Sequence, residues 1–122
     1  MEIAAMDRAQ KIALYGRGHA LLTDALARFP QEMWPYRSPV DPWTIHEIVL
    51  HITDSEANSY VRCRRFIAEP GQSLMAYDEN GWAKMLDYHK LDVDTAVALF
   101  KWLRQSTCEL LQTLPEDAWQ NQ

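Results

Sequence analysis

Side chains that bind metals or move protons are concentrated in one short stretch, WTIHEIVLHITDSE, at residues 43–56. It holds two histidines and three carboxylates. Imidazole is the commonest protein ligand for transition metals, and carboxylates complete many such sites. The stretch therefore indicates either one part of a metal site or a solvated helix with one buried face.

The spacing of the two histidines argues against a metal site made by this stretch alone. Two ligands on one helix must share a face, so they lie three or four residues apart. His46 and His51 are five apart, which separates them by about 140° around a helix. The zinc-protease motif HExxH is also absent, because Leu50 stands where its second histidine is needed.

A helical projection places His51 and Arg62 at the margin of the side expected to face a helical core, and His46 and Asp54 off that side. The side expected to face inward carries Ile48, Ile52, Ser55, Ser59 and Phe66. Spacing alone favours His51 as a core-edge histidine hydrogen-bonded to a neighbour over His51 as a metal ligand. We expect His46 and Asp54 to be solvated.

Other residues could still complete a site around His51. Glu47 lies four residues before His51, so the two share a face, although a helix-capping role competes for its carboxylate. His19 lies within the first predicted helix and His89 in a predicted loop. Either could approach His51 in three dimensions, and the sequence leaves this open.

The first half of the chain predicts two helices with an irregular connection. Residues 4–29 form the first helix, with glycines near its middle. Four prolines in residues 30–43 exclude regular structure there. Thr44 and Glu47 fit a capping box, so a second helix begins at residue 45 and runs to about residue 68.

The second half predicts a short helix and another long one. Asp78 opens a short helix that carries Trp82, and Asp92 or Asp94 caps a long helix that ends at Pro115. Residues expected to face inward on the long helix are Val93, Ala96, Val97, Phe100, Leu103, Leu110 and Leu111. Core packing is also expected for the aromatic residues Trp82, Tyr88, Phe100 and Trp102. We expect the run Arg62, Arg64 and Arg65 to be solvated, with Arg62 able to face a pocket.

These elements predict an all-α fold, an up-and-down helical bundle of three long helices and a short one, in one domain over residues 1–122. The net charge of −5 and the absence of a basic run argue against nucleic-acid binding. No apolar run approaches the ~20 residues that span a membrane, and no signal peptide is evident. Cys63 and Cys108 form no disulfide framework and are expected to be small packing residues. A cytoplasmic protein is the expectation.

The order of several segments resembles the DinB-like superfamily, in particular its YfiT-type metal-dependent hydrolases. The segments are WTIHEIVLHITDSE, YVRCRRFI, YDENGWAKMLDY and LFKWLRQSTCELLQTLPEDAW. The similarity extends from about Trp34 to Trp119. It implies a four-helix bundle, often dimeric, with a small-molecule substrate and a divalent metal such as zinc or nickel.

The resemblance also implies that three histidines bind this metal. One lies in a W-x-x-x-E-x-x-x-H context, which here places it at His51. The other two form an H-x-x-x-H pair on a final helix, and the remaining histidines of this chain, His19, His46 and His89, contain no such pair. We therefore expect an incomplete site that does not bind metal stably, and a fourth bundle helix that is missing or supplied by a partner.

The sequence leaves two functions open, of which the resemblance implies the first and the missing histidine pair favours the second. The first is a metal-dependent hydrolase or thiol transferase, which would activate water or a thiol at an open metal position. The second is a non-catalytic helical module that forms a homodimer through an exposed groove. The catalytic residues and the substrate are not identified by the sequence.

Overall fold

The computed structural model describes residues 5–71 and 76–120, and within them all regular structure is helical, as predicted. The α-helices are α1 (Arg8–Gly16), α2 (Gly18–Leu26), α3 (Ile45–Ala68), α4 (Glu79–Met85) and α5 (Val93–Thr113). Short 3-10 turns occur at Gln31–Met33, Tyr88–Lys90 and Glu116–Gln120. None of the helices that the structure describes is both long and apolar enough to cross a membrane.

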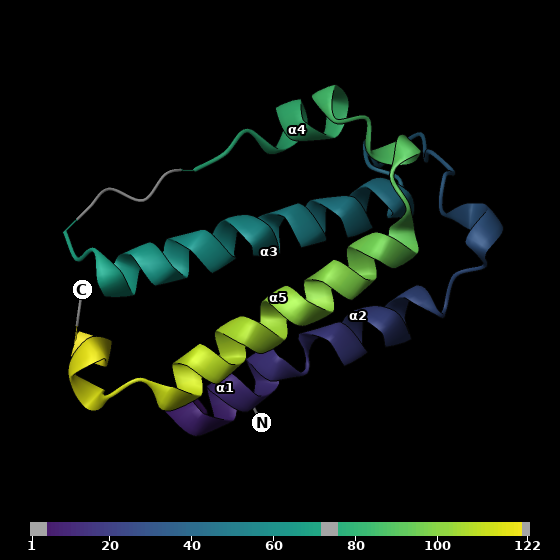
Figure 1. Ribbon diagram of the computed structural model, residues 1–122. Coiled ribbons are helices and arrows are strands. Elements are labelled where there is room, and N and C mark those ends of the chain that lie inside the picture. Colours follow the sequence, from purple (N-terminus) through teal and green to yellow (C-terminus); the bar gives the residue numbers. More distant parts are fainter. Residues whose placement is uncertain (1–4, 72–75, 121–122) are drawn as a thin grey trace.

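Helix α5 lies at the centre of the arrangement (Figure 1). Helix α3 packs along one side of α5 and runs in the same direction, while α1 and α2 pack on α5 in the opposite direction. Parallel neighbours need a long crossover connection, and α4 lies on that connection, against the outer side of α3. One side of α3 therefore faces α5, and another faces α4.

The first predicted helix is interrupted, which corrects the expectation of one continuous helix over residues 4–29. It divides at Arg17 into α1 and α2, and residue 4 lies outside the described residues. A β-carbon at Gly16 would lie 3.0 Å from the Cys108 Sγ, and one at Gly18 would lie 2.6 Å from the Arg104 Nη1. Both glycines thus allow the break to approach α5 closely.

Helix α3 begins as the capping box predicts. The Thr44 hydroxyl accepts a hydrogen bond from the Glu47 amide at 3.1 Å, and the Glu47 carboxylate accepts one from the Thr44 amide at 3.0 Å. Thr44 is almost fully buried. A helix start leaves four amides without partners, and these two hydrogen bonds satisfy two of them.

The caps of the two later helices agree with the sequence. Asp78 accepts from the Gly81 amide at the start of α4, and Asp92, rather than Asp94, accepts from the Thr95 amide at the start of α5. Phe100 and Tyr88 are buried as expected. Trp102 is 59% exposed, so its predicted place in the core is wrong.

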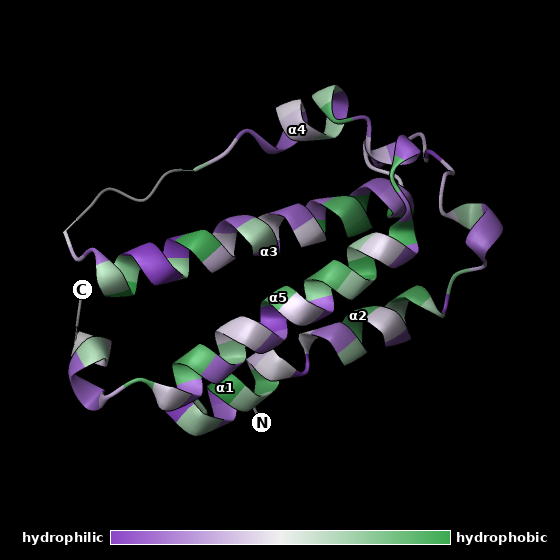
Figure 2. Ribbon diagram, viewed as in Figure 1, coloured by the Kyte–Doolittle hydropathy of each residue, from purple (hydrophilic) through white to green (hydrophobic). Residues whose placement is uncertain are grey.

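The side of α3 that packs on α5 differs from the predicted one. Its buried residues are Val49, Leu50, Thr53 and Glu56. Of the side expected to face inward, Ser59 is exposed, Phe66 is 39% exposed, and the two isoleucines are only half-buried. The packed side pairs two apolar residues, Val49 and Leu50, with two polar ones, so no continuous apolar stripe marked it in the sequence. Figure 2 shows how closely hydrophilic and hydrophobic residues are interleaved along α3.

Buried polar groups on the packed side of α3 all find partners. Thr53 donates to the Ala96 carbonyl at 2.9 Å. The Glu56 carboxylate accepts from the Arg104 guanidinium at 2.8 Å and from the Tyr15 hydroxyl at 2.5 Å. Burial, with the nearby Glu56 carboxylate, raises the pKa of Tyr15. This ionic cluster ties α1, α3 and α5 together.

Arg64 also belongs to this packed side, which corrects the expectation that it is solvated. Its guanidinium donates to the Thr107 and Ser106 hydroxyls at 3.0 and 3.1 Å. It also lies 3.4 Å from the centroid of the Tyr60 ring. One of the three clustered arginines therefore fastens α3 to α5.

Candidate functional site

His51 lies half-buried on the side of α3 that faces away from α5, opposite the buried residues Val49, Leu50, Thr53 and Glu56 rather than at the margin of the packed side where the projection placed it. Its ring packs against Trp43, with 5.2 Å between centroids and a tilt of 60°. Its Nδ1 lies 3.5 Å from the Tyr77 hydroxyl oxygen. The imidazole is therefore held by an aromatic ring on one side and a hydroxyl on the other.

Tyr77 links His51 to the segment that crosses outside α3. Its hydroxyl oxygen lies 2.5 Å from the Ser55 Oγ, and its ring packs on Trp82 with 4.6 Å between centroids. Burial raises the pKa of Tyr77, against the opposing effect of the Ser55 hydrogen bond. Tyr77 was not among the predicted site residues, because nothing in its local sequence signals a contact with a helix more than twenty residues away.

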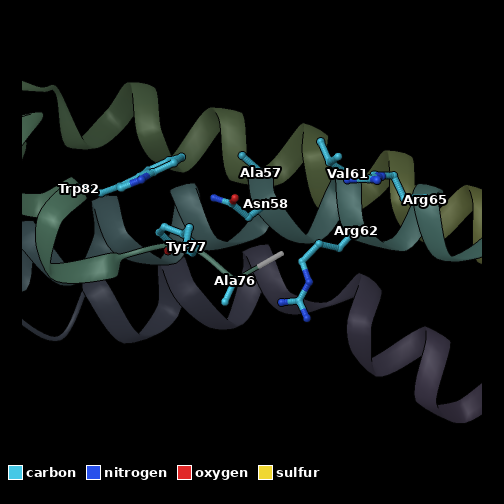
Figure 3. Close-up of a pocket in the computed structure, with 8 residues that line it drawn as sticks. All are labelled: Ala57, Asn58, Val61, Arg62, Arg65, Ala76, Tyr77 and Trp82. Carbon is cyan, nitrogen blue, oxygen red and sulfur yellow. The ribbon is translucent and has the colours of Figure 1, made fainter. Parts of the chain in front are cut away.

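Polar residues continue along the same side of α3 beyond His51. Alternating spacings of four and three keep residues on one face of a helix. His51, Ser55, Asn58, Arg62 and Arg65 follow this spacing, and we call them the open face of α3. Its C-terminal half, Asn58, Arg62 and Arg65, borders a cavity of about 430 Å³ between α3 and the α4 segment. Figure 3 shows Tyr77 and Trp82 at one end of this cavity and the two arginines toward the other.

His46 and His89 lie together at the start of α3, so the expectation that His46 is solvated is wrong. Their ring centroids are 4.8 Å apart, and the His46 Nε2 donates to the Leu91 carbonyl at 2.8 Å. The His89 Nε2 lies 3.1 Å from the Thr44 hydroxyl and 3.8 Å from a Glu47 carboxylate oxygen. These contacts stabilise the start of α3.

The Glu47 carboxylate serves this helix start. It accepts from the Arg37 guanidinium at 3.0 Å as well as from Thr44. Burial alone would raise the pKa of Glu47, but the Thr44 hydrogen bonds and the Arg37 charge hold it below its ordinary value. In the structure the Glu47 carboxylate therefore caps α3 and pairs with Arg37.

The last two candidates also lie elsewhere. Asp54 is half-buried and accepts from the Tyr88 hydroxyl at 2.8 Å, so it too is not a solvated residue. Burial and this carboxylate raise the pKa of Tyr88. His19 borders a separate cavity beside Lys101 and Cys108. Neither His19 nor His89 is brought to His51.

The donor groups that the structure describes do not make a complete metal site. Among these residues, no group of three or more histidine, cysteine, aspartate or glutamate side chains lies close enough to hold an ion. Around His51 the neighbouring polar atoms are hydroxyls of Tyr77 and Ser55, which are weak ligands for zinc or nickel. The described residues alone therefore do not fit the metal that the family resemblance implies.

The described helices form a helical bundle, and the open face of α3 carries one imidazole, that of His51. Family comparison makes the assignment specific: the chain belongs to the DinB superfamily, whose model matches residues 14–122. The resemblance seen in the sequence is confirmed.

Curated relatives carry names of one kind. A protein of Oceanobacillus iheyensis named "Putative metal-dependent hydrolase" is 33% identical over 72 residues, covering 59% of this chain and 41% of the relative. A protein of Bacillus cereus strain AH820 with the same type of name is 34% identical over 95 residues, covering 76% and 53%. The chain thus spans about half the length of the curated relatives that it matches.

A solved structure agrees with the fold. YfiT from Bacillus subtilis, described as a probable metal-dependent hydrolase with an unusual four-helix bundle topology, superposes with a TM-score of 0.84. The match covers 99% of this chain and 71% of YfiT, at 24% sequence identity. At this identity the likeness establishes the fold.

Proposed function

We propose that this protein acts as a metal-dependent hydrolase and that His51 is the ligand contributed by α3. The names of its relatives support the reaction class. The observation that carries the role of His51 is its contact with Tyr77. Metal-binding histidines commonly have their second ring nitrogen fixed by a hydrogen-bonding group. With Nδ1 facing the Tyr77 hydroxyl, Nε2 is the nitrogen left to bind a metal.

One imidazole is fewer than the three protein ligands of a typical catalytic zinc site. Since the described residues supply no other strong donor beside His51, a working site needs further ligands. We therefore expect this 122-residue chain by itself to bind zinc or nickel weakly or not at all. The two free thiols, Cys63 and Cys108, are consistent with a cytoplasmic location, which we also propose.

The activity is tested by hydrolysis of a panel of small esters and amides with and without added zinc or nickel. With metal in excess we expect at most a low, metal-stimulated rate, and His51→Ala should abolish it. His19→Ala is the matched control, because it removes one histidine from a different cavity and should keep the stimulation. Metal stimulation that survives His51→Ala would contradict the proposal.

A second candidate function is a helical module that forms a homodimer. Apolar residues on α3 support it: Val61 is 52% and Phe66 39% exposed, and Ile48 and Ile52 are only half-buried. Exposed apolar area costs roughly 25 cal/mol per Å², and a second copy could cover it. Light scattering should give the mass of a dimer. A monomer mass without binding of a hydrophobic dye would contradict this candidate.

A further inference from the structure

The cavity between α3 and the α4 segment has an apolar wall and a charged end. Its volume of about 430 Å³ lies in the range of small-molecule sites. Ala57 and Val61 form part of the wall on α3, and Asn58 places an amide between the two ends (Figure 3). The cavity is thus built for a molecule with an apolar body and few polar groups.

The charged end carries two arginines on a protein of net charge −5. Arg62 is exposed, and no ion pair among the described residues engages it. Arg65 forms an ion pair with the exposed Glu69, at 3.6 Å. Like charges one helical turn apart repel each other slightly, so an anion between them would be stabilising.

A purely structural role explains one of these arginines but not the other. Cations favour the last turn of a helix, and Arg65 lies in that turn of α3. Arg62 lies a turn earlier, where this effect has fallen off. By contrast, Arg64, which lies between them in sequence but on the packed side of α3, donates hydrogen bonds to Ser106 and Thr107 on α5. Arg62 is therefore the arginine whose position points to a ligand.

The opposite end of the cavity is aromatic and adjoins His51. The Tyr77 and Trp82 rings pack on each other with a tilt of 59°, and both border the cavity. The Tyr77 hydroxyl faces Ser55 and His51 on the other side. A molecule in the cavity would thus have its anionic end at the arginines and its body directed along α3 toward His51.

We propose that this cavity binds a small organic anion with an aromatic or apolar body, with the anion at Arg62 and Arg65 and the body against Trp82 and Tyr77. The proposal names a substrate class for the hydrolase proposed above. It rests on that function only in calling the bound anion a substrate. Binding itself requires no metal, so the two proposals can fail separately.

The test uses 4-phenylbutyrate as the probe and the uncharged 4-phenylbutan-1-ol as its counterpart, with affinities measured by isothermal titration calorimetry on the full chain without metal. We expect the carboxylate to bind about tenfold more tightly than the alcohol, because charge-assisted hydrogen bonds to arginine are strong. Raising the salt to about 1 M should shrink this preference.

Variants of the lining residues test whether the preference for the carboxylate arises at the two arginines. Arg62→Gln combined with Arg65→Gln should remove most of the preference for the carboxylate and leave alcohol binding unchanged. Trp82→Ala should weaken both probes. Arg28→Gln, an exposed arginine at the end of α2, is the matched control and should change neither. Equal affinity for the two probes, no binding of either, or a preference that survives the double variant would overturn the proposal.

Discussion

Both sides of α3 carry polar residues but use them differently. On the side that faces α5, Thr53, Glu56 and Arg64 are each satisfied by partners within the protein. On the open face, the polar contact of His51 with Tyr77 is long, and Arg62 has no partner among the described ion pairs. Polar groups on the first side stabilise the fold, whereas His51 and Arg62 on the second are available to ligands.

This comparison predicts its largest effect at Glu56. Glu56→Ala leaves the Arg104 guanidinium, whose side chain is 20% exposed, without its carboxylate. Removing one partner of this buried ion pair should lower the free energy of unfolding by about 3 kcal/mol. Urea denaturation measures this loss. The control is Glu69→Ala, which removes an exposed carboxylate of the same helix region and should change the free energy of unfolding by no more than about 0.5 kcal/mol.

The double variant Glu56→Leu with Arg104→Leu sharpens this prediction. Replacing both charges with apolar groups should recover much of the lost stability, since no charge is then left unpaired. If Glu56→Ala instead costs no more than Glu69→Ala, the ionic cluster does not stabilise the fold.

A direct comparison of the two sides uses neighbouring arginines. Arg64→Ala removes two hydrogen bonds to α5 and a contact with the Tyr60 ring, and should cost about 2 kcal/mol. Arg62→Ala should cost no more than about 0.5 kcal/mol, because it removes no contact that holds the fold. Thermal and urea unfolding of both variants check this. Equal losses would mean that the two sides are not distinct.

The start of α3 should show a smaller effect. Thr44→Ala removes the hydroxyl that caps α3 and contacts His89, and should cost about 1 to 2 kcal/mol. Thr113→Ala, at the exposed end of α5, is the control and should be nearly neutral. No shift in the unfolding midpoint of Thr44→Ala would show that the cap contributes nothing.

The smallest effect concerns acid stability. The pKa of Glu47 in the folded state lies below its ordinary value of 4.5. Its stabilising contribution is therefore present above that value and is lost as the pH falls through the lower folded pKa. Glu47→Gln keeps the geometry of a capping box but should flatten this part of the acid-side decline. Glu32→Gln, which replaces an exposed carboxylate outside the start of α3, is the matched control measured from pH 6 to about pH 3.

The sequence was sufficient for α3, α4 and α5 and their caps, because these depend on local chemistry, but it missed the break between α1 and α2. Thr44, Asp78 and Asp92 begin helices as predicted. It was insufficient for the side of α3 that packs inward. That side includes Glu56, whose burial depends on Tyr15 and Arg104 from distant helices, and no local pattern reveals such partners.

The candidate site was predicted only in part for the same reason. Helical periodicity grouped His51 with Ser55 on one side of α3, but it did not show that this side faces away from α5. Its contact with Tyr77 depends on the path of a connection that leaves α3 and returns across its outer side. Likewise, His46 and His89 could not be paired from sequence, since their contact requires the turn at Tyr88–Lys90 to fold against the start of α3.

The most direct test of the division between the two sides of α3 is a nickel titration followed by NMR of the 15N-labelled chain. Paramagnetic broadening should be weak, should need excess metal, and should centre on His51 and its open-face neighbours. It should disappear in His51→Ala and persist in His19→Ala. Broadening centred on His46 and His89, or tight stoichiometric binding lost in His51→Ala, would contradict this account of a single-ligand open face.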